Sequence, residues 1–147
     1  MDVFSDSFEN GARIPRKHTC EGENVSPPIK WGRVNGASTY AIIAEDPDAP
    51  GGTFVHWVIY NLTGTEIQEG IKPTSSTGVQ GKNDFGKTGY GGPCPPRGNG
   101  NHRYFFRIYA LNDTLPILSG VSALRLKELI KNKILDSGEI MGTYSRD

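Results

Sequence analysis

The chain has 147 residues, in which 16 lysines and arginines balance 16 aspartates and glutamates, so its formal charge at pH 7 is +0. This balance argues against a broad electrostatic hold on nucleic acid or on an anionic membrane surface. With 19 glycines and 10 prolines, the chain is expected to form many turns and few long helices, within a single domain over 1–147.

Three segments have the alternation and composition of β-strands. Residues 38–45 are largely apolar on both faces, which is typical of a strand that is covered on both sides. A cluster of Asp, Pro and Gly at 46–52 ends this strand, and the β-branched and aromatic residues of 55–60 predict a second one. The aromatic residues of 103–110 predict a third.

Two loops, one helix and a last strand complete the prediction. Residues 63–78 are polar and indicate a connecting loop with short strands, whereas 81–101 is a loop rich in Gly and Pro that leads into the third strand. Apolar residues at helical spacing predict a helix over 122–135 that begins after Ser122, and 139–144 is a candidate strand. We therefore expect a mainly β fold, an antiparallel β-sandwich with one helix near the C-terminus.

Polar side chains stand at the ends of the predicted strands: Asp46, Asp48, His56, His102 and Tyr104. Because alternate residues of a strand share a face, His102 and Tyr104 are expected on one side, and His56 on the same face as Val58 and Tyr60. If the three strands are neighbours, these groups converge at one rim of the sheet. The alternative is that they are unrelated turn residues.

Two motifs in this region resemble the signatures of a known family. Residues 46–50 (Asp-Pro-Asp-Ala-Pro), followed by His56 and Trp57, resemble the first signature of the phosphatidylethanolamine-binding protein family, which includes the Raf kinase inhibitor proteins. Residues 92–98 (Gly-Pro-Cys-Pro-Pro-Arg-Gly), followed by His102-Arg103-Tyr104, resemble the second. The similarity runs along nearly the whole chain and is to the short prokaryotic branch.

The resemblance implies a sandwich with a small anion-binding cavity at one end of the sheet. Carried over position by position, the lining residues are Asp46, Asp48, Ala49, His56, Pro95, Pro96, His102 and Tyr104. The implied ligand is a small phosphate-containing anion or a phosphoethanolamine-like headgroup, without metal or cofactor. The exposed loops 46–53 and 89–101 are expected to contact a partner, through the residues Pro50, Gly51, Gly92, Arg97 and Asn99.

The chemistry of these side chains suits an anion. Imidazole and phenol groups donate to phosphate, and backbone N–H groups of 92–100 are expected to add donors. A hydrogen bond from His56 or His102 to Asp46 would fix the tautomer and favour the charged ring, and Asp46 could face the cationic end of a zwitterionic ligand. Binding is therefore expected to weaken as pH rises through the histidine range.

Family members inhibit kinases or proteases, so the resemblance implies a non-catalytic regulator of a partner enzyme, of the serine protease inhibitor type or a kinase inhibitor. The alternative is a small hydrolase or a metal-dependent enzyme that uses the same histidines and aspartates. Against it, the chain has no Gly-x-Ser-x-Gly motif and no compact metal-ligand spacing, and Cys94 lies between prolines with no sign of an oxyanion hole.

Hydropathy and cysteine content bear on the compartment and the redox state. No segment approaches the length of a membrane span, and the acidic start is unlike a signal peptide, so we expect a cytoplasmic protein without integral membrane association. Two cysteines are too few for a disulfide scaffold. Reduced Cys20 and Cys94 are the expectation, and one bridge that joins two loops is the alternative.

Overall fold

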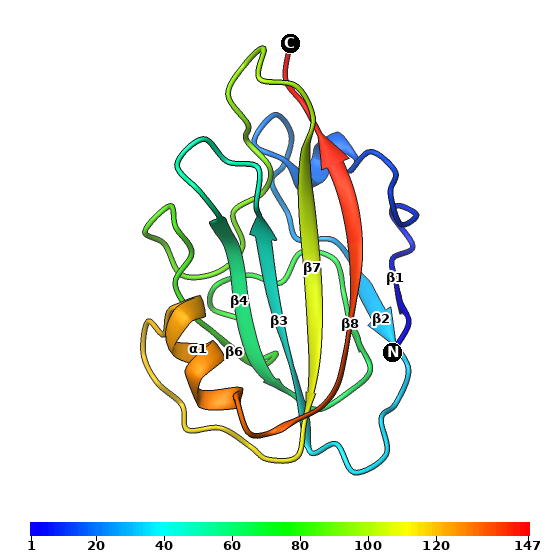
Figure 1. The fold of residues 1–147 in the computed structure, drawn as a ribbon, viewed down its shortest axis with the longest axis vertical. Coiled ribbons are helices and arrows are strands. Elements are labelled where there is room, and N and C mark those ends of the chain that lie inside the picture. The colour runs from blue at the N-terminus through cyan, green and yellow to red at the C-terminus, as the bar shows by residue number, and fades with distance from the viewer.

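Two antiparallel sheets face each other in the computed structural model, which describes residues 1–147 (Figure 1). The larger sheet has the order β6-β4-β3-β7-β8; its strands are β3 (Thr39–Asp46), β4 (Phe54–Leu62), β6 (Val79–Gln80), β7 (His102–Leu111) and β8 (Ile134–Tyr144). The smaller has the order β1-β2-β5; its strands are β1 (Val3–Phe4), β2 (Ile29–Trp31) and β5 (Glu66–Ile67). A short 3-10 helix, η1 (Arg16–His18), and one α-helix, α1 (Ala123–Ile130), complete the fold. The mainly β prediction with one helix near the C-terminus is confirmed.

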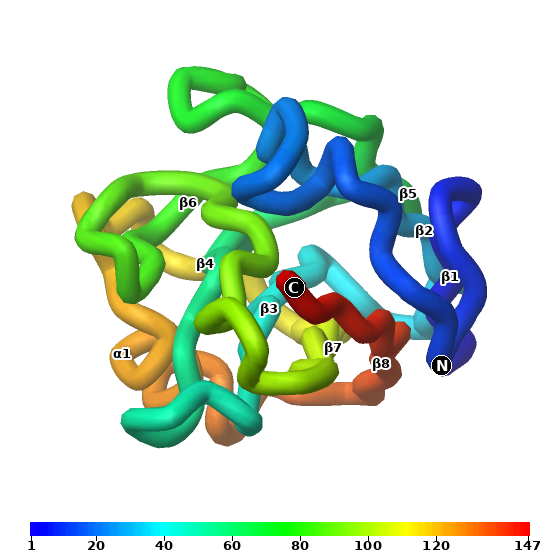
Figure 2. Tube along the Cα trace, turned by 90° about the horizontal axis from the view of Figure 1, so that it is seen from above, coloured from blue at the N-terminus to red at the C-terminus, as the bar shows by residue number.

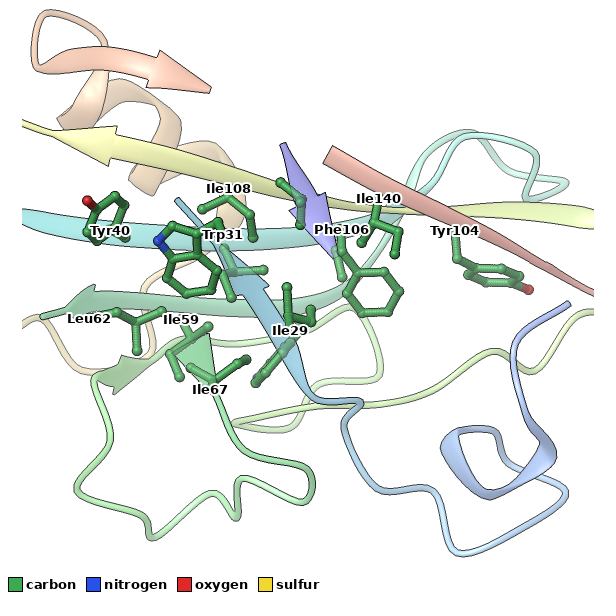
Figure 3. Packing of buried hydrophobic residues seen from close by; sticks show 14 of the residues in the cluster. Ile29, Trp31, Tyr40, Ile59, Leu62, Ile67, Tyr104, Phe106, Ile108 and Ile140 are labelled. Carbon is green, nitrogen blue, oxygen red and sulfur yellow. The ribbon is translucent and has the colours of Figure 1, made fainter. Parts of the chain in front are cut away.

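The main core lies between the two sheets. Ile59 of β4, Phe106 of β7 and Ile140 of β8 point toward Ile29 and Trp31 of β2, and all five side chains are buried (Figure 3). Side chains alternate along a strand, so every second residue of the larger sheet reaches this layer. Burial of each such side chain contributes about 1.5–3 kcal/mol relative to exposure, which makes this layer the main source of stability.

A second core covers the other face of the larger sheet. Leu126 and Ile130 of α1 pack on Val58, Tyr60 and neighbouring residues of that face. β3, in the middle of the sheet, is therefore buried on both sides, and all of its residues are buried. This arrangement confirms the prediction that the strand is covered twice.

The helix is shorter than predicted. Ser122 caps it as expected, because its hydroxyl accepts a hydrogen bond from Arg125 N at 3.1 Å. However, the helix ends at Ile130, and Ile134 and Leu135 are the first residues of β8. β8 pairs with β7 along its length, and this pairing overrides the local helical spacing.

Near its start, β4 contains one residue more than the β3 segment it faces. Ala44 pairs with Trp57, but the next residue of β3, Glu45, pairs with Val55. His56 is therefore the unpaired residue of a β-bulge, near the start of β4 and close to the loop 47–53 that precedes the strand.

The bulge changes the direction of the His56 side chain. Its ring lies edge-on to Tyr104, with the centroids 5.2 Å apart, on the inner face where Trp57 also packs. Val58 and Tyr60 pack on the opposite face, under α1. The prediction that His56 shares a face with these two residues is wrong, because it assumes an uninterrupted alternation.

The ends of four strands meet at one end of the molecule. Asp46 at the end of β3 pairs with Phe54 at the start of β4, and His102 at the start of β7 pairs with Tyr144 at the end of β8. Figure 2 looks along the molecule from this end and shows the C-terminus beside the loop between β6 and β7. Loops and chain end together surround the site described next.

Candidate functional site

A cavity of about 190 Å³ opens where β3 ends and β4 and β7 begin. Four polar side chains come from the strand ends, and most of the apolar ones come from the loops. The lining residues are Asp46, Ala49, Pro50, Phe54, His56, Phe85, Cys94, Pro95, Pro96, His102 and Tyr104.

Seven of the eight predicted lining residues stand around this cavity, and Asp48 does not. Of the lining residues that the prediction omits, Pro50 was assigned to partner contact instead. Phe54 precedes His56 by two positions, so strand alternation could have found it. Phe85 comes from the irregular loop 81–101, where no periodic signal indicates its direction.

His56 offers one unused ring nitrogen to the cavity. Its Nδ1 donates a hydrogen bond to the Gly91 carbonyl at 2.7 Å, and Gly91 N donates to the His56 carbonyl at 2.9 Å. Nε2 has no protein partner, although only 5% of the residue is exposed. Burial lowers the pKa of His56, so the free protein holds the ring neutral at neutral pH.

His102 and Asp46 form the polar floor of the cavity. Nδ1 of His102 lies 2.7 Å from Oδ2 of Asp46, and Nε2 lies 2.6 Å from Oδ1 of Asn99. Oδ1 of Asp46 accepts a hydrogen bond from Asp48 N at 2.7 Å. Both ring nitrogens of His102 thus face oxygen atoms of the protein. Every one of these atoms therefore already has a partner within the protein, Asp46 through both of its oxygens.

Tyr104 supplies a phenol beside both imidazoles. Its ring stacks on His102 with the centroids 6.4 Å apart and meets the edge of His56. Burial, then the negative charge of Asp46 and the interaction of the hydroxyl with that carboxylate, raise the pKa of Tyr104. The hydroxyl therefore keeps its proton at neutral pH and can donate it in a hydrogen bond.

Two phenylalanines form an apolar wall. Phe54 and Phe85 meet edge to face with the centroids 4.8 Å apart, and both rings pack against His56. Phe85 is 46% exposed, so part of this wall faces solvent. The cavity thus joins a polar floor to an apolar side.

Asp48 points away from the cavity, contrary to the prediction. Its carboxylate accepts hydrogen bonds from the Arg103 backbone N–H and guanidinium, with three distances of 2.9 Å. This contact with Arg103 lowers the pKa of Asp48 to about 2. The residue ties the loop 47–53 to β7 and does not reach a ligand in the cavity.

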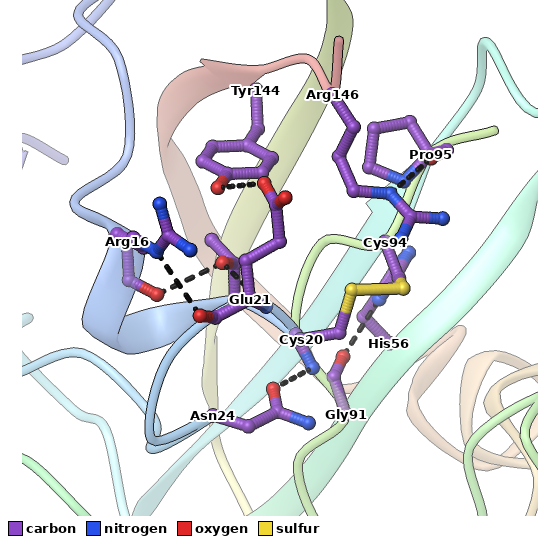
Figure 4. The surroundings of a disulfide bond; sticks show 12 residues. Arg16, Cys20, Glu21, Asn24, His56, Gly91, Cys94, Pro95, Tyr144 and Arg146 are labelled. Atoms are coloured by element: carbon purple, nitrogen blue, oxygen red, sulfur yellow. Dashed lines mark hydrogen bonds between the residues drawn. A yellow bond between two sulfur atoms is a disulfide. The ribbon is translucent and has the colours of Figure 1, made fainter. Parts of the chain in front are cut away.

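A disulfide fixes the wall that carries Pro95 and Pro96. Cys20 and Cys94 are bridged, although they are 74 positions apart, and Cys20 N donates to the Pro93 carbonyl at 3.1 Å (Figure 4). The expectation of reduced thiols is therefore wrong, and the bridge that the sequence left open is present. Cys94 consequently has no thiol that could act as a nucleophile.

Gly92 is buried and cannot contact a partner as predicted. Its N–H donates to Oδ1 of Asn24 at 2.8 Å, and a Cβ there would collide with the His18 carbonyl. Further along the loop, Gly98 N donates to the Arg146 carbonyl and Asn99 N to the Pro96 carbonyl. These three N–H groups are engaged within the protein, so they do not supply the anion donors expected of 92–100.

The other predicted contact residues lie at the surface. Gly51, Arg97 and Asn99 are exposed, and Pro50 is both exposed and part of the cavity lining. Asn99 also faces His102 through its side-chain oxygen. Of these four residues, Gly51 and Arg97 are exposed without lining the cavity, whereas Pro50 lines it and Asn99 contacts its floor.

Fold and cavity together define a class: small antiparallel β-sandwiches with one polar-floored cavity at the strand ends. The sequence model of the phosphatidylethanolamine-binding protein family matches residues 4–145. The chain belongs to this family.

Prokaryotic relatives match along the whole chain. The UPF0098 protein of Aquifex aeolicus is 46% identical, over 100% of this chain and 90% of the relative. A crystal structure of a Chlamydia trachomatis homologue of phosphatidylethanolamine-binding protein is 37% identical with a TM-score of 0.91, covering 99% of this chain and 97% of the other. The structure of Escherichia coli YbcL, described as a new member of the mammalian family, is 30% identical with a TM-score of 0.90. It covers 99% of this chain and 98% of the other.

A more distant likeness is to a carboxypeptidase Y inhibitor, solved in complex with its cognate proteinase. Its TM-score is 0.51 at 14% identity, covering 93% of this chain and 76% of the other. At this identity the likeness concerns the fold alone.

Two kinds of feature are missing from the structure, a membrane-spanning helix and a cluster of metal ligands. No helix has the length and apolar character of a membrane span. No group of three or more His, Cys, Asp or Glu side chains is arranged to hold a metal ion. The cytoplasmic location stays a prediction.

Proposed function

We propose that this protein is a non-catalytic binding protein, whose cavity takes the anionic group of a small phosphate-containing ligand and which regulates or inhibits a partner enzyme, a serine-type protease or a kinase. The observation that carries the ligand class is the unused Nε2 of His56, at a cavity whose other ring nitrogens and carboxylate oxygens are already bonded.

An anion in this cavity would change the protonation of His56. The free ring is neutral because burial lowers its pKa, whereas a negative charge next to Nε2 favours the charged ring. Binding would therefore take up a proton, and Nε2 would donate it to the ligand. The Tyr104 hydroxyl is a second donor.

The engaged carboxylates favour the phosphate over the ethanolamine part of a headgroup. Asp46 is bonded through both oxygens, and Asp48 is bonded to Arg103 outside the cavity. An ammonium group in the cavity would therefore have to share Asp46 oxygens that already have protein partners. The rest of the ligand would lie against the apolar wall of Phe54 and Phe85.

Titration calorimetry with sulfate tests the role of His56, because the charge of sulfate is constant across the histidine range, unlike that of phosphate. Uptake of one proton makes the affinity fall by up to about tenfold per pH unit as pH rises. His56→Asn keeps a donor for the Gly91 carbonyl but has no titrating ring, so it should bind weakly and without pH dependence. Equal affinity of the wild-type protein at about pH 5.5 and pH 7.5 would contradict the proposal.

Three contacts support a binding role over a hydrolase or a metal-dependent enzyme. Cys94 is in a disulfide, both ring nitrogens of His102 face oxygens, and both oxygens of Asp46 are bonded. An esterase and phosphatase screen checks this point. Turnover by the wild-type protein that His56→Asn abolishes would favour the enzyme instead.

Inhibition of a partner enzyme is tested with a panel of serine proteases and kinases. A three-glycine insertion after Gly51, at the exposed tip of the loop beside the cavity, should abolish any inhibition and leave the unfolding temperature unchanged. The control is the same insertion after Gly64, an exposed turn at the other end of β4. Inhibition that survives the first insertion but not the second would place the contact away from the cavity.

A further inference from the structure

Only some of the arginines of this neutral chain form ion pairs with carboxylate side chains. Arg103, Arg107 and Arg125 form ion pairs with carboxylates. The other five have no carboxylate side chain within ion-pair distance: Arg13, Arg16, Arg33, Arg97 and Arg146. Four of these five, all except Arg33, lie around the same end of the molecule, and we call them the arginine rim.

Contacts fix the arginine rim beside the cavity. Arg146 Nε donates to the carbonyl of Pro95, a lining residue, at 2.7 Å, and its side chain lies next to Cys94 (Figure 4). Arg97 directly follows Pro96, another lining residue, in the same loop. These two arginines border the mouth.

The other two arginines surround the neighbouring residue Tyr144, which pairs with His102. The Arg13 guanidinium lies 4.3 Å from the centroid of the Tyr144 ring. Arg16 Nε donates to the Glu21 carbonyl at 3.1 Å, and the Glu21 carboxylate accepts a hydrogen bond from the Tyr144 hydroxyl. The rim thus continues from the cavity mouth across the end of β8.

Positive charge exceeds negative charge here. Glu21 is the carboxylate within the rim, and the charges of Arg16, Arg97 and Arg146 add to the Tyr144 hydrogen bond in lowering its pKa. Asp147, whose backbone oxygen accepts from Arg97, adds an exposed carboxyl group. Each guanidinium has five N–H donors, and one or two of them in each arginine bond to the protein.

We propose that the arginine rim binds an acidic peptide segment of a partner protein, placed so that one anionic side chain of the segment enters the cavity. This inference rests on the proposed function, since it needs a cavity that takes an anionic group. Guanidinium groups pair with carboxylates through two parallel hydrogen bonds. A peptide fits better than a nucleic acid, because four arginines on a neutral chain are few for a phosphate backbone.

Fluorescence anisotropy with a labelled octaglutamate peptide tests the rim, with octaglutamine as the uncharged control. The octaglutamate peptide should bind, and more weakly as salt is added. The double variant Arg16→Gln with Arg97→Gln should bind the peptide about tenfold more weakly, because it loses two partly exposed ion pairs with peptide carboxylates. Arg33→Gln with Arg125→Gln removes the same charge elsewhere and should have little effect. Arg13 and Arg146 stay unchanged because they contact Tyr144 and Pro95.

If the two double variants bound octaglutamate equally well, the arginine rim would not be the docking surface. If the wild-type protein bound a labelled octathymidylate more tightly than octaglutamate, the choice of a peptide as the occupant would be wrong. Sulfate titration of the same proteins separates the two proposals. Sulfate binding without rim-dependent peptide binding leaves the cavity proposal standing and refutes this one. Rim-dependent peptide binding that saturating sulfate does not weaken refutes the entry of a side chain into the cavity.

Discussion

Asp46 and Asp48 are separated by one residue and make different contacts in this protein. Asp46 is the last residue of β3, and its Oδ1 accepts a hydrogen bond from Asp48 N, which turns the chain away from the strand direction. Asp46 therefore stays in the floor of the cavity while Asp48 meets Arg103. The family resemblance assigned both to the cavity lining, whereas the structure places only Asp46 there.

Asp48→Asn is expected to affect stability and leave the cavity intact. Arg103 is 52% exposed, so solvent screens the pair, and its loss should cost about 0.5–1 kcal/mol of unfolding free energy at neutral pH. The pair lowers the Asp48 pKa to about 2. Its contribution is thus present above the ordinary aspartate range and disappears as pH falls toward 2.

Urea unfolding of both proteins between neutral and acid pH measures this effect, and the difference between them should shrink as pH falls. Sulfate titration is the control. A large loss of sulfate affinity in Asp48→Asn would contradict the position of Asp48 outside the cavity.

At the scale of elements, the long strands could be predicted and their irregularities could not. The predicted strands 38–45, 55–60 and 103–110 correspond to β3, β4 and β7, each within two residues at either end. Because both faces of the larger sheet are largely covered, these segments are rich in apolar residues on both faces, which makes them recognisable in the sequence.

Pairing decides the features that the sequence does not reveal. β1, β2 and β5 have two or three residues each, too few for a periodic pattern. The bulge at His56 and the early end of α1 are set by partner strands that lie far away in sequence. The family motifs identified most of the cavity, whereas Phe85 lies outside both motifs in a loop with no periodic pattern.

At the scale of the whole molecule, one disulfide joins the N-terminal segment to the cavity. Cys20→Ser with Cys94→Ser opens a loop with a sequence separation of 74, which should lower the free energy of unfolding by about 4 kcal/mol. Sulfate should bind more weakly, because Cys94 lines the cavity and holds the segment of Pro95 and Pro96.

Urea unfolding of the variant, compared with the wild-type protein with and without reductant, checks the prediction. The reduced wild-type protein should behave as the variant does. Unchanged stability in both would mean that the surrounding hydrogen bonds, such as Cys20 N to the Pro93 carbonyl, hold the loop without the bridge.

The bulge at position 56 of β4 also bears on how such a scaffold can diversify. Val55 and Trp57 pair with Glu45 and Ala44, so the register of the strand does not depend on which residue stands at position 56. A lineage can exchange that one imidazole for another group while the strand pairing remains in place, provided that the new side chain still donates to the Gly91 carbonyl and packs against Tyr104. Ligand preference can thereby change without a change in the register of the sheet.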